Sequence, residues 1–175
     1  MSRFFWRSVL GPLLVLALVC GCGAKEEGPP PKENYVLKLT FSADPDMNPD
    51  GRGGQSALAV RVFALSATDA FEGADYFALQ TDAKKTLEET LVEDVFRFVI
   101  RPGERQTIPL SEAPPGVSYL GFIAGYKDIY STVWQSLYQL PPAPEQSWLS
   151  SPVAIRLEIR LTRFGLEIIE PTGNR

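Results

Sequence analysis

Residues 153–161 read VAIRLEIRL and show the clearest alternation in the chain. Apolar residues occupy every second position and charged residues stand between them: Val153, Ile155, Leu157, Ile159 and Leu161, against Arg156, Glu158 and Arg160. A period of two places the two sets of side chains on opposite faces of a β-strand. This stretch therefore predicts a strand with one buried face and one exposed face.

The same period recurs along most of the chain after Tyr35. Further predicted strands cover residues 35–42, 58–63 and 95–100, with weaker contrast in 106–110, 119–127 and 166–169. Proline- and glycine-containing turns separate them, at 48–51, 101–104 and 114–116, because proline presets φ and glycine accepts a positive φ. Many short strands with such turns predict a mainly β protein, a two-sheet antiparallel β-sandwich.

Residues 68–91 break this alternation. Thr68 and Asp69 form a helix-capping pattern, and the apolar positions that follow are three or four residues apart: Phe71, Ala74, Phe77 and Ala78. A second, more polar turn starts at Asp82, with Leu87 and Leu91 four apart. We expect a short helical insertion between the second and third strands that packs its aromatic edge on the sandwich; an extended loop is the alternative.

The composition narrows the classes of function. The 175 residues include 17 basic and 21 acidic side chains, for a net charge of −4, which does not favour nucleic acid as a partner. The chain has no histidine, which is the usual general base and the commonest metal ligand. The only cysteines are Cys20 and Cys22, so no internal disulfide framework or cysteine-rich zinc site is expected.

No residue pattern favours catalysis. The lysines and acids of residues 84–94 are typical of a solvated face, and Gly51, Gly53 and Gly54 lack the Lys-Ser/Thr of a phosphate-binding loop. We therefore expect no enzyme activity, no catalytic residue and no bound cofactor.

The N-terminal segment is typical of an export signal. Arg3 and Arg7 precede an apolar run from Val9 to Cys20 of 12 residues, well short of the ~20 that span a bilayer. We interpret residues 1–21 as a signal peptide, with a short retained anchor as the alternative.

The end of this segment resembles the lipobox of bacterial lipoproteins. Gly21 precedes Cys22 directly, whereas the rival acceptor Cys20 follows the bulky Val19. The resemblance implies S-diacylglycerol and an N-acyl chain such as palmitate on Cys22, and two or more chains anchor a protein stably. Gly23 rather than aspartate after the cysteine points to the outer membrane, with the domain facing the periplasm.

A proline-rich tether follows the acceptor cysteine. The lipidated N-terminus and the tether together cover residues 22–34. The twelve residues after Cys22 include three consecutive prolines, Pro29 to Pro31, and reach at most ~35–40 Å. The predicted organisation is this lipidated tether, a sandwich domain over residues 35–170 and a tail over residues 171–175. Cleavage removes two arginines and leaves the mature chain at −6.

The connection between the first two predicted strands is unusually long. Residues 43–56 form a loop of 14 residues, where hairpin loops normally have 2–5, and long connections are often functional. A recognition surface is one interpretation and a disordered surface loop is the other. Asp46, Asn48, Asp50 and Gly51 also match the first half of an EF-hand calcium loop, but Ala57 stands where the bidentate glutamate is needed. We expect no metal site, since turn chemistry explains these residues.

Several motifs in order resemble the type VI secretion lipoproteins of the TssJ family, also called VasD or SciN. They are Gly21-Cys22, Asn48-Pro49-Asp50-Gly51-Arg52, Val60-Arg61-Val62-Phe63-Ala64-Leu65, Ala74-Asp75-Tyr76-Phe77-Ala78-Leu79, Arg101-Pro102-Gly103-Glu104, and Tyr119 to Asp128 followed by Trp134. The resemblance implies a transthyretin-like sandwich that binds the periplasmic C-terminal part of the inner-membrane protein TssM. The family's contact loop corresponds here to residues 43–56. The candidate partner-binding residues are Asp44, Asp46, Asn48, Pro49, Asp50, Gly51, Arg52 and Gln55.

A periplasmic ligand-binding lipoprotein, for a sugar or a peptide, is the alternative function. Tyr126, Tyr130, Trp134 and Tyr138 are spaced by four and could form an aromatic platform, although core and edge packing also explains them. If the loop is not the partner contact, exposed aromatics such as Tyr130, Trp134 or Trp148 are the next candidates.

Overall fold

The structure is a computed structural model, and it describes residues 35–110, 113–142 and 153–169. The predicted signal peptide, Cys22, the tether, Trp148 and the C-terminal tail lie outside these residues. The strands are β1 (Tyr35–Ala43), β2 (Leu58–Leu65), β3 (Leu91–Ile100), β4 (Arg105–Leu110), β5 (Tyr119–Ala124), β6 (Gln135–Gln139), β7 (Val153–Leu161) and β8 (Leu166–Ile169). The helices are α1 (Asp69–Glu72), α2 (Tyr76–Leu87) and the 3₁₀ turn η1 (Glu88–Thr90). The mainly β prediction is confirmed.

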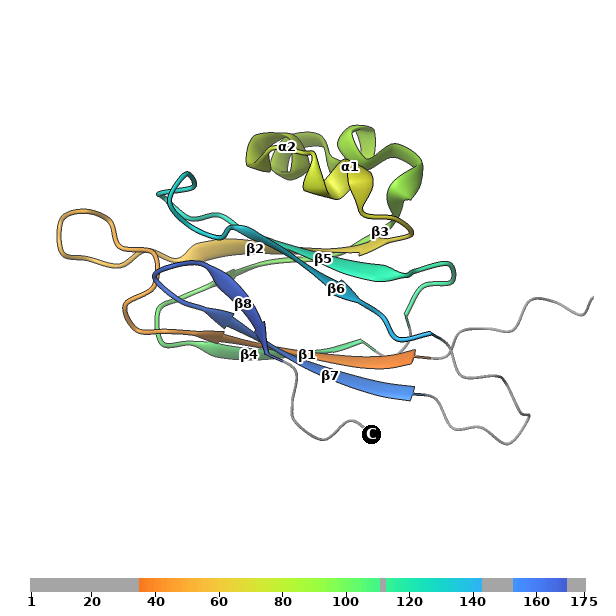
Figure 1. The fold of residues 1–175 in the computed structure, drawn as a ribbon. Helices are drawn as coiled ribbons and strands as arrows, with labels where there is room; N and C mark the ends of the chain where they lie inside the picture. Colours follow the sequence, from red (N-terminus) through yellow and green to blue (C-terminus); the bar gives the residue numbers. More distant parts are fainter. Residues whose placement is uncertain (1–34, 111–112, 143–152, 170–175) are drawn as a thin grey trace, which may run out of the picture. The chain divides into compact units, whose positions relative to one another are not determined.

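The strands form two four-stranded sheets, ordered β4-β1-β7-β8 and β3-β2-β5-β6, which face each other as a sandwich (Figure 1). All the pairs are antiparallel except β1 and β7, which run parallel with Leu37 opposite Ile155 and Phe41 opposite Ile159. The prediction of a two-sheet antiparallel sandwich is confirmed, with this one pair as the exception. Alternation fixes which side chains point inward, but it does not fix the direction of the neighbouring strand.

The main core lies between the two sheets. The inward residues of β1 from Leu37 onward and of β7 from Ile155 onward are buried, as their alternation predicts. Val60, Val62 and Phe122 meet them from the other sheet. Phe41 packs edge-on against Phe98 with ring centroids 4.9 Å apart, a favoured arrangement of aromatic rings.

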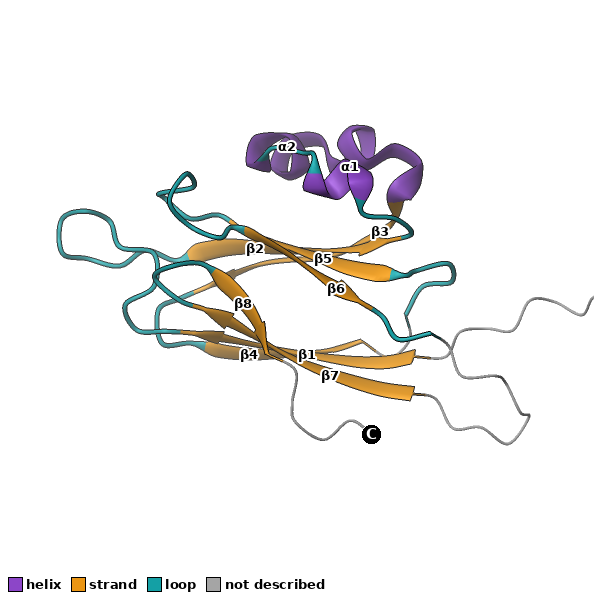
Figure 2. Cartoon of the chain, in the orientation of Figure 1, coloured by secondary structure: helices purple, strands orange, loops and turns teal. Residues whose placement is uncertain are grey.

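Two helices cover the outer face of the second sheet (Figure 2). This face forms a smaller core, in which Phe63 of β2 packs against Phe71 of α1, and Leu79 and Leu87 of α2 complete the cluster. Gly121 of β5 permits this contact, because a Cβ there would lie 2.9 Å from the ring of Phe71. The helical insertion is thus confirmed, and it explains why β2 is buried on both faces.

The helical insertion differs from the prediction in detail. It is interrupted after α1, and α2 begins at a new cap, where Asp75 accepts a 3.0 Å hydrogen bond from the backbone of Ala78. The new start rotates the buried face, so Phe77 is 63% exposed rather than packed on the sandwich. Leu91 was expected in the second helical turn and is instead the first residue of β3. The predicted restart at Asp82 is present as a kink, where φ is −144°.

Arg61 ties the helices to the sheet beneath them. Its side chain is buried, its Nη1 donates to the carbonyls of Leu79 (2.7 Å) and Gln80 (3.1 Å), and its Nε donates to Asp94 (3.0 Å). The guanidinium also lies 4.8 Å from the ring centroid of Phe63. The carbonyls belong to the last turn of α2 before its kink, where a cation is favourable. These bonds compensate the burial of the charge.

Candidate partner-binding site

Four connections meet at one end of the sandwich, which we call the loop end. They are the β1–β2 loop (44–57), the β3–β4 turn (101–104), the β5–β6 loop (125–134) and the β7–β8 turn (162–165). Backbone hydrogen bonds join them: Ala43 donates to Glu104 and Asp44 donates to Leu161, each at 2.9 Å. In Figure 1 the loop end lies at the left, and β1 starts at the opposite end.

The β1–β2 loop is a folded hairpin rather than a disordered surface loop. Pro49 and Gln55 form a β-bridge, and the backbone of Asp50 donates to Gly54 at 2.9 Å. Gly51 and Gly53 turn the tip with φ of +74° and +87°, a region that favours glycine. The hairpin therefore presents its exposed tip in one defined shape.

Asn48 holds the base of this hairpin. It is 2% exposed with φ +48°. Its Nδ2 donates to the carbonyls of Ser56 (3.3 Å) and Ala57 (3.2 Å), and its Oδ1 accepts the backbone N–H of Lys127 (2.8 Å). The prediction grouped Asn48 with contact residues, but its side chain has almost no free surface. Its role in the structure is to fix the hairpin to the β5–β6 loop.

Asp50 shapes the tip. Its Oδ1 accepts the backbone N–H groups of Arg52 (2.8 Å) and Gly54 (2.9 Å). These bonds to the ionised form, first that from Arg52, hold the pKa of the Asp50 carboxyl below its usual value of 3.8. Pro49, Gly51, Arg52 and Gln55 remain exposed around this carboxylate, so the tip is the part of the predicted site that a partner can reach.

The side-chain oxygens that match a calcium loop already interact with other groups of the protein. The Oδ1 of Asn48 and the carboxylate of Asp50 accept backbone hydrogen bonds, and Asp46 lies 4.0 Å from Arg163. Within residues 35–110, 113–142 and 153–169, no group of three or more Asp, Glu, Cys or His side chains has a metal-binding arrangement.

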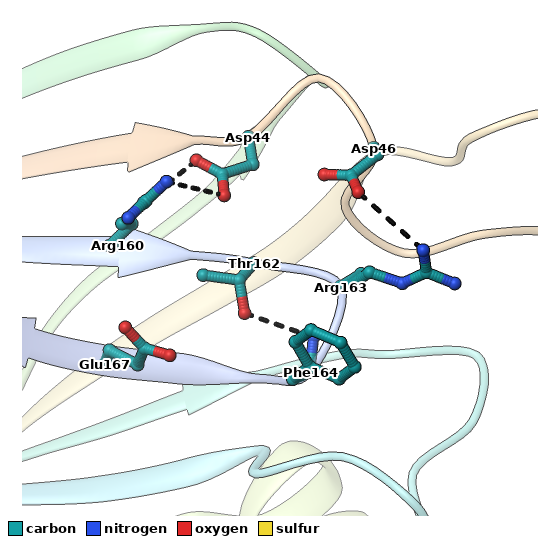
Figure 3. A pocket seen from close by; sticks show the side chains of 7 residues that line it. All are labelled: Asp44, Asp46, Arg160, Thr162, Arg163, Phe164 and Glu167. Atoms are coloured by element: carbon teal, nitrogen blue, oxygen red, sulfur yellow. Dashed lines mark hydrogen bonds and ion pairs between the residues drawn. The ribbon is translucent and has the colours of Figure 1, made fainter.

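A pocket of about 250 Å³ lies beside the hairpin, at the β7–β8 turn (Figure 3). Its lining residues are Asp44, Asp46, Arg160, Thr162, Arg163, Phe164 and Glu167. Asp44 accepts two 3.0 Å bonds from the guanidinium of Arg160. This hydrogen bonding, followed by the charge of Asp44, raises the pKa of Arg160 above its usual value. Two predicted residues, Asp44 and Asp46, thus face a pocket rather than the hairpin tip.

The sequence did not identify Arg163, Phe164 or Glu167 as site residues. The gap between the last two predicted strands, residues 162–165, marked a turn. The position of this turn next to Asp44 and Asp46 depends on the parallel β1–β7 pair, which aligns residues 118 positions apart, such as Ala43 and Leu161. Strand periodicity contains no signal for that pairing.

Comparison with known proteins decides the family. Residues 35–163 match the family model T6SS-SciN, described as type VI secretion lipoprotein, VasD, EvfM, TssJ. The chain belongs to this family. A search of curated proteins found no match.

Solved structures share the fold of this type VI secretion lipoprotein. The T6SS lipoprotein TssJ1 from Pseudomonas aeruginosa is 28% identical with a TM-score of 0.70, covering 80% of this chain and 98% of its own. Serratia marcescens Lip, described as a membrane-bound component of the type VI secretion system, is 26% identical with a TM-score of 0.68, covering 77% and 97%. A chain of a structure described as the T6SS protein TssM C-terminal domain from EAEC has the same fold at 17% identity and a TM-score of 0.58, covering 78% and 98%. The resemblance and the sandwich fold are confirmed.

The aromatic platform of the alternative function does not form in this type VI secretion lipoprotein. Tyr126 is buried in the core, where burial raises the pKa of its hydroxyl, whereas Tyr130 is 94% exposed. Trp134 packs edge-on against Tyr76 with ring centroids 5.6 Å apart. Tyr138 lies in β6, a strand that the sequence analysis missed because QSLYQ shows little alternation. Tyr126, Trp134 and Tyr138 serve packing, and Tyr130 stands in solvent apart from them.

No helix in the described part of this type VI secretion lipoprotein has the length and apolar character needed to span a bilayer.

Proposed function

We propose that this type VI secretion lipoprotein is anchored in the outer membrane by lipid on Cys22 and binds the periplasmic C-terminal domain of a TssM-type inner-membrane protein. The β1–β2 hairpin is the contact, and the role is structural rather than enzymatic. Family membership supports a role in type VI secretion, and the signal-like N-terminus supports a lipid anchor on Cys22. The structure described as a TssM C-terminal domain, which contains a chain of this fold, supports the class of partner.

The observation that carries the proposal is the direction in which β1 runs, from the tether to the hairpin. Tyr35 follows the predicted tether directly, and Ala43 leads into the hairpin. The nine residues of β1 are joined by eight steps of about 3.3 Å, which separate the two ends by about 26 Å. A lipid at the tether end allows the loop end to face away from the membrane, toward a partner in the periplasm.

The fixed conformation of the hairpin also favours a binding role. Asn48 and Asp50 fix its shape by hydrogen bonds before any partner arrives. A preformed loop loses less conformational entropy on binding than a flexible one. The exposed Arg52 and Gln55 are therefore held in place for contact.

The anchor is tested by fractionation and mass spectrometry of the native-host protein. The wild-type chain should carry the lipid mass on Cys22 and sediment with outer membranes. Cys22→Ala should fold and remain in the soluble periplasmic fraction, whereas the matched control Cys20→Ala should behave as wild type. An unmodified Cys22 thiol in the native host would contradict the anchor.

The contact is tested by titration calorimetry of the mature chain, made soluble by Cys22→Ala, with the TssM-type periplasmic domain. Arg52→Ala at the tip should weaken binding about tenfold, which corresponds to about 1.4 kcal/mol. Arg97→Ala, on the exposed face of β3, is the matched control and should leave the affinity unchanged. Equal affinities for both variants would exclude Arg52 as a contact, and no binding by the wild-type chain would exclude the partner.

A further inference from the structure

The β7–β8 turn holds an aromatic side chain in solvent on a rigid support. Phe164 is 71% exposed. Its backbone N–H donates to the hydroxyl of the buried Thr162 at 3.1 Å, and the N–H of Thr162 donates to the carbonyl of Gly165 at 2.9 Å. The ring therefore projects from a four-residue turn that is closed by internal hydrogen bonds.

This turn is joined to the β5–β6 loop. Val133 donates to the carbonyl of Phe164 at 3.0 Å, and Leu166 donates to the carbonyl of Val133 at 2.8 Å. Gly165, at φ +143°, permits the junction, because a Cβ there would lie 2.5 Å from the carbonyl oxygen of Val133. Val133 is itself 58% exposed, so the junction brings together two segments that each carry an exposed apolar side chain at the loop end.

The pocket beside Phe164 has an excess of negative charge. It contains three acids and two arginines, and Asp44 is already paired with Arg160. Asp46 and Arg163 are 4.0 Å apart with both side chains more than half exposed, and such pairs contribute little. Glu167 forms no ion pair with any residue in the described part of the chain. Glu167 stands opposite Arg160 in the β7–β8 pair, and its charge also acts on Arg160. The three acids nevertheless exceed the two arginines by one charge, so the pocket keeps a net negative charge that favours a basic side chain of a partner.

We propose that Phe164, Val133 and this pocket form a second contact for the partner, which inserts an arginine or lysine side chain between Asp46 and Glu167. This inference rests on the proposed function and specifies the partner's chemistry. A volume of about 250 Å³ lies below the ~300–1,000 Å³ of small-molecule sites and suits one long side chain. The inserted cation contacts the ring of Phe164, which already has the guanidinium of Arg163 at 5.5 Å from its centroid.

The surface formed by Phe164, Val133 and the pocket also resembles the centre of a protein–protein interface. Exposed aromatic side chains surrounded by polar groups are typical of binding hot spots. It adjoins the hairpin through Asp44 and Asp46, so one partner domain can touch both. The family match ends at residue 163, before Phe164 and Glu167, so the geometry rather than the family match supports these two residues as contacts.

The test measures affinity of the mature Cys22→Ala chain for the TssM-type periplasmic domain by calorimetry. Phe164→Ala should weaken binding at least tenfold. Phe77→Ala is the matched control, because Phe77 is equally a solvent-exposed phenylalanine (63%) but lies on α2 over the other sheet. It should change the affinity less than twofold, and both variants should melt within a few degrees of the wild-type chain.

The charge is tested separately. Glu167→Gln should weaken binding about fivefold and reduce its dependence on salt, whereas Glu93→Gln on β3 should do neither. A Glu167→Lys chain should regain affinity for a partner domain in which the inserted basic residue is changed to glutamate.

The outcomes separate this inference from the proposed function. Wild-type affinity for both Phe164→Ala and Glu167→Gln, with a loss for Arg52→Ala, would refute the second contact and leave the proposed function standing. Absence of binding by the wild-type chain would refute both.

Discussion

Replacing Asn48 by alanine should both destabilise the domain and weaken partner binding. The substitution removes three hydrogen bonds, two to Ser56 and Ala57 and one from Lys127. At about 0.5–1.5 kcal/mol each they sum to about 3 kcal/mol. For a domain of this size the expected fall in melting temperature is about 10 °C. Thermal denaturation followed by circular dichroism measures it.

Two further variants show whether the lost hydrogen bonds of Asn48 cause the fall in melting temperature. Asn48→Gly loses the same hydrogen bonds but accepts φ +48° freely, so it should recover about 1 kcal/mol relative to alanine. Gln55→Ala, on the exposed side of the hairpin, should leave the melting temperature within about 1 °C of wild type. A melting temperature for Asn48→Ala within 2 °C of wild type would refute the assignment of Asn48 as the residue that fixes the hairpin.

Three other outcomes follow from the structure. Arg61→Ala should lower the free energy of unfolding by about 3 kcal/mol, measured by urea denaturation, because it leaves the carbonyls of Leu79 and Gln80 without their donor; an unchanged midpoint would contradict this. The pKa of Asp50, measured by carboxyl NMR, should lie below 3.8. Because the folded pKa is depressed, the carboxylate stabilises the hairpin tip at pH values above 3.8, and this stabilisation is lost as the pH falls through the folded pKa. The amides of Arg52 and Gly54 should then exchange faster with solvent. Gly165→Ala should lower the melting temperature by several degrees and also reduce partner affinity, since a Cβ would collide with Val133; an affinity equal to that of the wild type would disconnect the turn from binding.

Periodicity predicted most of the strands, and the reason is physical. Strands such as β7 have one face in the core and one in water, so their alternation is strong. β2 is buried on both faces, and its alternation is weaker because the helices cover its outer side. β6 is only half-buried and has polar residues at both ends, which removed the signal.

The candidate site was predictable only in its local part. The turn chemistry of Asn48, Asp50 and the glycines marked the hairpin, because those residues act on their own backbone. The pocket combines Asp44 with Arg160 and Asp46 with Arg163, contacts between distant segments. Such contacts arise from the order of strands in the sheet, which a single sequence does not encode locally.

The central position of β1 has a mechanical consequence for the proposed role, in which the molecule links two membranes. β1 is paired along its length on both sides, over six residues with β4 and nine with β7. Tension applied between a lipid at one end of this strand and a partner at the other would run parallel to its axis. Both ladders would then bear the load in shear, with their hydrogen bonds sharing the force rather than opening one after another.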